Sequence, residues 1–340
     1  MSVKRPDYSK MTKLERCELA ESIFIEHPRL KELIAQIHHA QIYSRIAAEP
    51  ECVFIGGLPG AGKTTLTEHY EQLFPRIIHE DRVEIPVLCG RVPSKATDNN
   101  LATALLLKLE DPASDKGTAF NRTMRLYNFI KVCGVRLIVL DEFQHFVDKD
   151  SWRVLKNVSD WLKNLIDETG VPIVLIGMPY AVEILDAPGN EQLQRRFSVR
   201  SSIEPFGWDT DEERKGFRVF LRKVDETLPL NDSSYLSDPL TAFRFYCATN
   251  GRVGKVMKVV RRATELALDE GLERLTLDTL AAAYDERVMA DQPERVNPFR
   301  SPQEDLRVIP IEEPQMNFAA MSRRSRRRVR EEAVSHVLRI

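Results

Sequence analysis

A glycine-rich stretch, residues 57–64, carries the clearest chemical signal: its spacing is Gly-x4-Gly-Lys-Thr. The apolar run 52–55 precedes it and a helix-forming run follows, which is the context of a phosphate-binding loop. Glycines let backbone N–H groups approach phosphate oxygens, and the new helix directs its positive dipole end at them. Lys63 is predicted to contact the β- and γ-phosphates during catalysis, and the Thr64 hydroxyl to ligate Mg²⁺. The predicted nucleotide-binding residues are Gly57, Pro59, Gly60, Ala61, Gly62, Lys63, Thr64 and Thr65.

A second motif, which is acidic, completes the predicted ATP site. Four apolar residues, 137–140, predict a buried strand, and Asp141 and Glu142 follow at its carboxyl end. Asp141 suits the Walker B role of holding Mg²⁺, and Glu142 is placed to orient and deprotonate the attacking water. An acidic residue directly after this aspartate favours a hydrolytic motor or switch over most small-molecule kinases. We therefore expect a Mg²⁺-dependent ATPase, with ATP and Mg²⁺ as cofactors.

Cations near the γ-phosphate are also required for phosphoryl transfer. Arg195 and Arg196 stand just before the last apolar run and are candidates for an arginine that acts on a neighbouring subunit's nucleotide. The residues alone leave open which of the two acts, or whether both form ordinary salt bridges. In the later helical part, Arg252 and Lys255 are candidates for a basic residue that reaches the phosphates, and we assign nucleotide binding to Lys255.

Alternating strand and helix patterns predict an α/β core with a five-stranded parallel sheet. The predicted strands are 52–56, 83–88, 135–140, 171–177 and 199–203, and the predicted helices 64–73, 98–109, 119–132, 151–168 and 180–186. After residue 209 only helical patterns remain, at 210–226, 238–249, 253–270 and 277–289. The expected organisation is N-terminal helices 1–50, nucleotide-binding core 51–208, all-helical lid 209–290 and Pro-rich linker with basic tail 291–340.

Composition sets further bounds. The 340 residues carry a formal net charge of −2, which by itself predicts no polyanionic partner. Five scattered cysteines without a CxxC pair indicate reduced thiols rather than a disulfide frame or zinc site. No apolar run approaches the roughly 18 residues of a membrane span, so we expect a cytoplasmic protein. The arginine-rich stretch 323–330 is either a solvated surface or a contact for nucleic acid or protein.

Together these motifs resemble the AAA+ ATPases: a phosphate-binding loop, a Walker B strand, an Arg-Arg-Phe before the fifth strand and an all-helical lid. A closer resemblance is to the TniB/TnsC-type regulators of DNA transposition in Tn7-like transposons, over roughly residues 20–290. Three short sequence segments carry this resemblance: Glu26-His27-Pro28-Arg29, Asp141-Glu142-Phe143-Gln144-His145 and the run 171–177.

The resemblance implies a protein that oligomerises as a ring or helical filament on double-stranded DNA. It would link a target-selector protein of the TniQ-like kind to the transposase, and ATP hydrolysis would drive disassembly. The family contacts DNA without sequence preference, through loops that correspond here to 91–97 and 116–123. The DNA-contacting residues carried over are Lys95, Thr97, Lys116 and Arg122.

Two departures from the AAA+ pattern are visible. Many AAA+ proteins end the fourth strand with a polar residue that positions water, whereas Met178 follows Gly177 here; either Gln144 compensates or hydrolysis is slow. The lid helix places Gly254 or Lys255 where a sensor arginine is expected. The alternatives are a replication-type initiator or helicase loader, a P-loop phosphotransferase, and an immune-type signalling NTPase. Glu142 and the helical lid argue against the phosphotransferase, and the absence of a long repeat array argues against the signalling NTPase.

Overall fold

In the computed structural model the described residues are 5–44, 46–94, 97–146, 152–186, 190–289 and 296–309. The chain divides into two compact units. Among the described residues, a sheet unit contains 29–59 and 63–203, and a helical unit contains those up to 28, Gly60–Gly62 and those from 204 to 309. Lys95, the arginine-rich stretch and residues 291–295 and 310–316 of the Pro-rich stretch lie outside the described residues. In the described parts, no helix has the length and apolar character needed to cross a membrane.

The sheet unit is built on five parallel strands in the order β4-β5-β6-β1-β7. Register pairs Val53 with both Val174 and Val199, so β1 lies between β6 and β7. The three central strands are apolar and fully buried, as expected for a parallel sheet covered on both faces. The strands are β1 (Val53–Gly57), β4 (Val87–Arg91), β5 (Leu137–Asp141), β6 (Ile173–Gly177) and β7 (Val199–Ile203).

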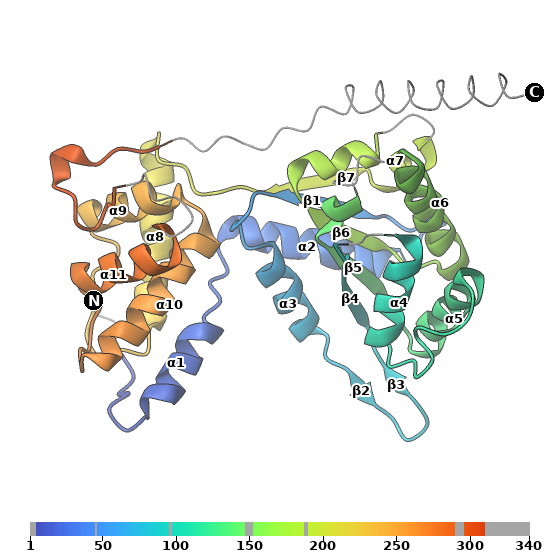
Figure 1. Cartoon of the computed structure of the whole chain (residues 1–340), viewed down its shortest axis with the longest axis horizontal. Helices are drawn as coiled ribbons and strands as arrows, with labels where there is room; N and C mark the ends of the chain where they lie inside the picture. The colour runs from blue at the N-terminus through green and yellow to red at the C-terminus, as the bar shows by residue number, and fades with distance from the viewer. Residues whose placement is uncertain are drawn as a thin grey trace, which may run out of the picture. The chain divides into compact units, whose positions relative to one another are not determined.

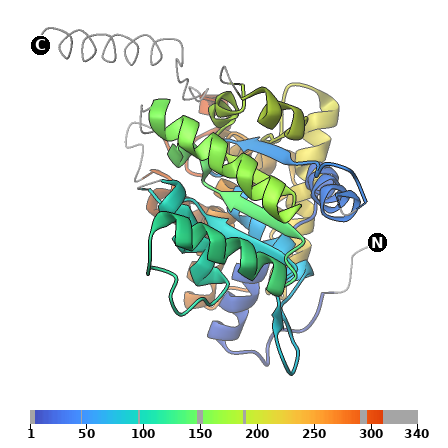
Figure 2. The same cartoon turned by 90° about the vertical axis from the view of Figure 1, so that its right-hand side faces the viewer.

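Helices cover both faces of this sheet, with α2 and α3 on one side and α4, α5 and α6 on the other (Figures 1 and 2). The core of the unit forms where α4, α5 and α6 bury leucine, isoleucine and valine side chains against the strands. The helices are α2 (Pro28–Tyr43), α3 (Lys63–Leu73), α4 (Asp98–Lys108), α5 (Ala119–Val132), α6 (Trp152–Thr169) and α7 (Glu191–Arg196), with 3₁₀ turns η1 (Phe143–Phe146) and η2 (Pro179–Ile184).

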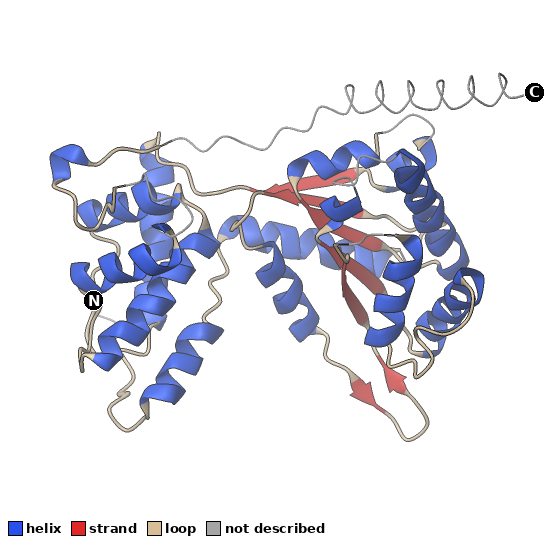
Figure 3. Cartoon of the chain, in the orientation of Figure 1, coloured by secondary structure: helices blue, strands red, loops and turns tan. Residues whose placement is uncertain are grey.

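The second predicted strand, 83–88, is wrong because these residues belong to two separate strands. Pro86 has no N–H to donate to a sheet, and it separates the short β3 (Val83–Glu84) from β4. β3 pairs instead with β2 (Ile77–Ile78) in a small antiparallel hairpin outside the main sheet, visible in Figure 3. The carbonyl of Pro86 accepts from the N–H groups of Arg136 and Leu137, which ties the hairpin's end to the start of β5.

The helical unit is a separate bundle with its own core of phenylalanine, leucine and valine side chains. Its helices are α1 (Lys13–Ser22), α8 (Asp211–Thr227), α9 (Pro239–Thr249), α10 (Val253–Asp269) and α11 (Leu277–Arg287), followed by the 3₁₀ turn η4 (Gln303–Asp305). Threonines 12, 210 and 276 each form a capping box at a helix start. α1 packs against α10 in this unit, so the expected N-terminal region 1–50 is divided between the two units.

Candidate nucleotide-binding site

The glycine-rich loop joins the carboxyl end of β1 to the first residue of α3, Lys63. Gly60 and Gly62 have φ angles of 76° and 103°, which side chains rarely permit, so glycine is required there. The Lys63 side chain is buried, and its Nζ donates to the carbonyl oxygens of Gly57 (2.7 Å) and Leu58 (3.2 Å). This arrangement folds the lysine along the inner side of the loop, where a bound phosphate would meet it.

Asp141 ends the buried strand β5 and faces the start of α3. The Thr64 hydroxyl donates to its Oδ2 at 2.9 Å, so the two predicted Mg²⁺ ligands lie side by side. Asp141 is 4% exposed, and burial raises the pKa of its carboxyl above the ordinary value. A hard cation prefers a carboxylate and a hydroxyl oxygen of this kind, so the residues present fit Mg²⁺.

Glu142 follows in a left-handed conformation with φ 59°, and its N–H donates to Asp141 Oδ1 at 2.7 Å. Residues other than glycine rarely adopt this conformation. It turns the chain at Glu142 away from the direction of β5. Three polar groups surround its carboxylate: Arg91 Nη2 at 3.5 Å, His145 Nε2 at 4.0 Å and the Gln144 side-chain amide, which donates to it. These contacts hold the carboxylate in one orientation.

Gln144 connects this carboxylate to the end of β6. Its Oε1 accepts from the backbone N–H of Met178 at 3.1 Å, and its side chain is 7% exposed. The Met178 side chain is buried, with Sδ 4.0 Å from Lys63 Nζ. The position where many AAA+ proteins carry a polar side chain therefore holds a thioether, and the polar contact comes from η1 instead.

Arg91 is a candidate site residue that the sequence interpretation did not assign. It is the last residue of β4 and pairs in register with Asp141. The alignment of β4 with β5 is what identifies it. Arg91 ends the strand next to the Walker B strand, so it lies at the same sheet edge as Glu142. Four residues later the chain reaches Lys95, which lies outside the described residues.

The two arginines before β7 have different surroundings. The side chain of Arg195 is 68% exposed and pairs with the exposed Glu49 at 2.9 Å. The side chain of Arg196 is 10% exposed, pairs with Asp167 of α6 and lies 3.5 Å from the carbonyl oxygen of Lys163. Only Arg195 extends to the surface, whereas Arg196 holds α7 against α6.

The basic residues of the helical part lie at the start of α10. Arg252 is the N-cap residue and is 6% exposed, and Lys255 lies in the first turn, partly buried. Within the helical unit, the Gly254 N–H donates to the Gly60 carbonyl at 2.9 Å. A Cβ on Gly254 would lie 2.7 Å from that carbonyl oxygen, so no arginine fits at position 254 in this arrangement.

The residues expected to contact DNA are distributed over two loops and the helices that follow them. Thr97 and Thr118 cap α4 and α5 through their hydroxyls, so Thr97 has a structural hydrogen bond, to Asn100 N–H at 3.1 Å. Lys116 is exposed. Arg122 lies in the first turn of α5 and donates to Thr103 Oγ1 and to the Asp115 carbonyl, both at 3.3 Å. Arg122 thus also fixes the loop between α4 and α5.

Comparison with known proteins gives two findings. A family model described as "Bacterial TniB protein" matches residues 16–206. No match was found among curated protein sequences.

Solved structures with a similar fold include archaeal proteins at low sequence identity. The Aeropyrum pernix ORC2 protein, solved as ADPNP–ADP complexes, superposes with a TM-score of 0.59 at 15% identity, over 80% of this chain and 72% of that one. The A. pernix ORC1 protein in complex with DNA gives 0.57 at 17% identity, over 80% and 69%. Cdc6p from Pyrobaculum aerophilum gives 0.58 at 13% identity, over 79% and 70%. The predicted fold is confirmed: an AAA+ P-loop core with a five-stranded parallel sheet and an additional helical unit.

Proposed function

The chain belongs to the bacterial TniB family, and on that premise we propose that it is an ATP-hydrolysing regulator of DNA transposition. The observation that carries the ATPase part is the contact between Thr64 and Asp141 at 2.9 Å, with Glu142 directly beside it. A P-loop threonine, a buried aspartate and an adjacent oriented glutamate support hydrolysis rather than nucleotide binding alone.

Each residue of this set has a proposed role. The loop N–H groups and Lys63 bind the phosphates, and Lys63 exchanges its bonds to Gly57 and Leu58 for phosphate oxygens. Thr64 and Asp141 would hold Mg²⁺, which would neutralise negative charge on the phosphates when bound. Glu142 takes the proton of the attacking water, and Gln144 keeps its carboxylate aimed. Thr65 and Lys255 are proposed as further nucleotide contacts.

The hydrolytic site is proposed to be complete only in an oligomer. Positive charge beyond the γ-phosphate is needed for fast transfer, and we assign it to Arg195 of a neighbouring subunit. The exposure of Arg195 supports this assignment, while the buried pairing of Arg196 with Asp167 supports a structural role. ATP would then favour assembly because its binding site includes residues of two subunits.

The remaining part of the proposal concerns partners. Lys95, Thr97, Lys116 and Arg122 are proposed to contact the backbone of double-stranded DNA, which gives affinity without sequence preference. On DNA the oligomer, a ring or a filament, would connect a TniQ-like target selector to the transposase. Hydrolysis would be slow because Met178 stands where many AAA+ proteins have a polar residue. It would then release the assembly from the DNA.

The test is the variant Glu142→Gln, which keeps size and removes the base. We expect it to bind ATP with Mg²⁺, to assemble on duplex DNA, and to persist there because hydrolysis is blocked; electron microscopy and phosphate release measure both properties. Lys63→Ala is the comparison that loses nucleotide binding itself. Wild-type hydrolysis by Glu142→Gln, or assembly by Lys63→Ala, would contradict the proposal. A strong preference for one DNA sequence in competition binding would instead indicate a replication-type initiator.

A further inference from the structure

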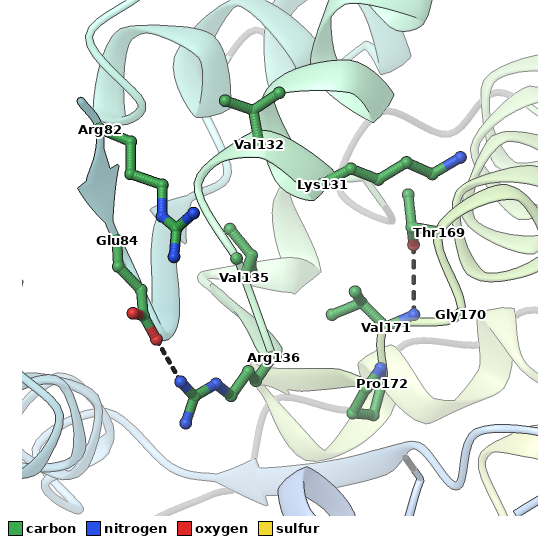
Figure 4. A pocket seen from close by; sticks show the side chains of 11 residues that line it. Arg82, Glu84, Lys131, Val132, Val135, Arg136, Thr169, Gly170, Val171 and Pro172 are labelled. Atoms are coloured by element: carbon green, nitrogen blue, oxygen red, sulfur yellow. Dashed lines mark hydrogen bonds and ion pairs between the residues drawn. The ribbon is translucent and has the colours of Figure 1, made fainter. Parts of the chain in front are cut away.

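A pocket lies on the sheet unit where β5 and β6 begin, at the opposite edge from the nucleotide site. Its volume is about 600 Å³. Its lining comes from the hairpin, the end of α5 with the loop before β5, and the turn between α6 and β6 (Figure 4). β5 and β6 begin at this pocket and end at the nucleotide site. The two sites are therefore separated by the length of one strand, which is about five residues or roughly 16 Å.

The charge of this pocket is positive. Three cations line it, Arg82, Lys131 and Arg136, together with the one carboxylate of Glu84. Glu84 is already paired with Arg136, and with His79 at 3.2 Å, and these contacts lower the pKa of its carboxyl. Arg82 and Lys131 are exposed, and their side chains make no hydrogen bond or ion pair with any residue in the described ranges.

The rest of the lining is apolar or lies at the ends of two helices. The side chains of Val132, Val135, Val171 and Pro172 form the apolar part of the wall. The helices α5 and α6 both end here. The turn after α5 already pairs its last carbonyl groups: Phe129, Ile130 and Lys131 accept from the N–H groups of residues 133, 135 and 134. Figure 4 shows Arg82 extending from the hairpin toward the hollow and Lys131 extending toward the turn at Thr169.

We propose that this pocket binds an extended acidic peptide segment of a partner protein, one that alternates carboxylate and aliphatic side chains. The carboxylates would pair with Arg82 and Lys131, and the aliphatic side chains would cover the valines and Pro172. The peptide N–H groups would donate to the Glu84 carboxylate. A nucleic-acid backbone has neither N–H donors for the Glu84 carboxylate nor aliphatic side chains for the valines and Pro172, so the mixed lining favours a peptide.

The test uses the full chain and a fluorescein-labelled short peptide of alternating Glu and Val residues, followed by fluorescence anisotropy at low salt. A Lys–Val peptide of the same length controls for the apolar component. The protein variants are Arg82→Ala/Lys131→Ala and, as a matched control, Lys223→Ala, which removes an exposed cation from α8 in the helical unit.

We expect the Glu–Val peptide to bind and the Lys–Val peptide not to bind. The double variant should weaken peptide binding about tenfold, with unchanged circular dichroism and melting temperature, while Lys223→Ala binds as wild type. Equal affinity in wild type and double variant would overturn the proposal, and so would an equal loss in Lys223→Ala. A loss of duplex DNA binding in the double variant with unchanged peptide binding would assign the pocket to DNA and also overturn it. These outcomes are independent of ATP hydrolysis.

Discussion

The Gln144 side chain connects Glu142 to the backbone of Met178: its amide donates to the Glu142 carboxylate, and its oxygen accepts from the Met178 N–H at 3.1 Å. The site therefore has a fixed polar bridge between η1 and the end of β6, although the residue at that strand end is a methionine. Since the bridge uses the main chain of Met178 rather than its side chain, the identity of residue 178 matters less than the presence of Gln144.

Replacing Gln144 by leucine should slow hydrolysis. Leucine is close in size but has neither donor nor acceptor, so Glu142 loses its fixed orientation while the loop around Lys63 is untouched. We expect kcat to fall by about tenfold to a hundredfold with KM nearly unchanged, because base positioning acts on the chemical step. Steady-state phosphate release measures both constants. Met178→Leu, which keeps the N–H, serves as the control and should hydrolyse as wild type. A Gln144→Leu variant with wild-type kcat would exclude the bridge from catalysis.

Removing Arg91 should raise hydrolysis in the absence of DNA. Its guanidinium lies 3.5 Å from Glu142 Oε1, so this ion pair competes with the attacking water for the carboxylate. Arg91 is also 74% exposed and begins the loop that we assign to DNA, so a phosphate would compete with Glu142 for it. We expect Arg91→Ala to hydrolyse roughly two- to fivefold faster without DNA and to lose stimulation by DNA. Arg91→Lys should retain the wild-type response. Lower rates with and without duplex DNA would contradict this coupling.

The sequence predicted those features that depend on neighbouring residues. The loop 57–64 and the pair Asp141–Glu142 were located by spacing alone, and Thr64 and Asp141 do lie in contact. Features that depend on residues far apart in the chain were not predicted. Arg91 joins the site through strand register, and Pro86 divides an apolar run into two strands that belong to different sheets. The same limit applied to Arg195 and Arg196, which are adjacent in sequence but differ because only one reaches α6.

Substitution of the two arginines should separate stability from catalysis. Arg196→Ala removes a mostly buried guanidinium that pairs with Asp167, so we expect a stability loss of roughly 1–3 kcal/mol. Arg195→Ala removes an exposed side chain and should leave the melting temperature unchanged while lowering hydrolysis by at least about a hundredfold. Thermal unfolding and phosphate release distinguish the two effects. A destabilised Arg195→Ala, or an Arg196→Ala that is stable and inactive, would reverse the assignment.

Mixing two inactive variants tests whether Arg195 acts on a neighbouring subunit. Glu142→Gln lacks the base and Arg195→Ala lacks the cation, so neither should hydrolyse ATP alone. In a mixed oligomer some junctions combine an intact Glu142 with an intact Arg195 from the adjacent chain, and activity should reappear in proportion to their number. Phosphate release from equimolar mixtures on duplex DNA is the measurement. No recovery in oligomers shown to be mixed would mean that Arg195 acts within its own subunit or not at all.

The last prediction concerns α1, which ion pairs hold in the helical unit. Arg16 is 6% exposed; it donates to the Pro229 carbonyl at 2.7 Å and to both oxygens of Glu273, at 3.1 and 2.6 Å. Arg16→Ala leaves these acceptors without their donor, and we expect a loss of roughly 2 kcal/mol at neutral pH. Arg16→Lys keeps the charge but lacks the planar fork, so it should recover only part of the loss.

The loss should depend on pH in a defined direction. The hydrogen bonds from Arg16 lower the pKa of Glu273 below its ordinary 4.5. A lowered carboxyl pKa in the folded state stabilises the protein above the unfolded pKa, and this contribution disappears as the pH falls through the folded value. The difference between wild type and Arg16→Ala should therefore be constant between about pH 6 and pH 8 and shrink below about pH 4.5. Thermal unfolding followed by circular dichroism at neutral and acid pH measures it. A difference that stays the same at acid pH would show that Arg16 stabilises α1 through the Pro229 carbonyl and packing, without the ion pair.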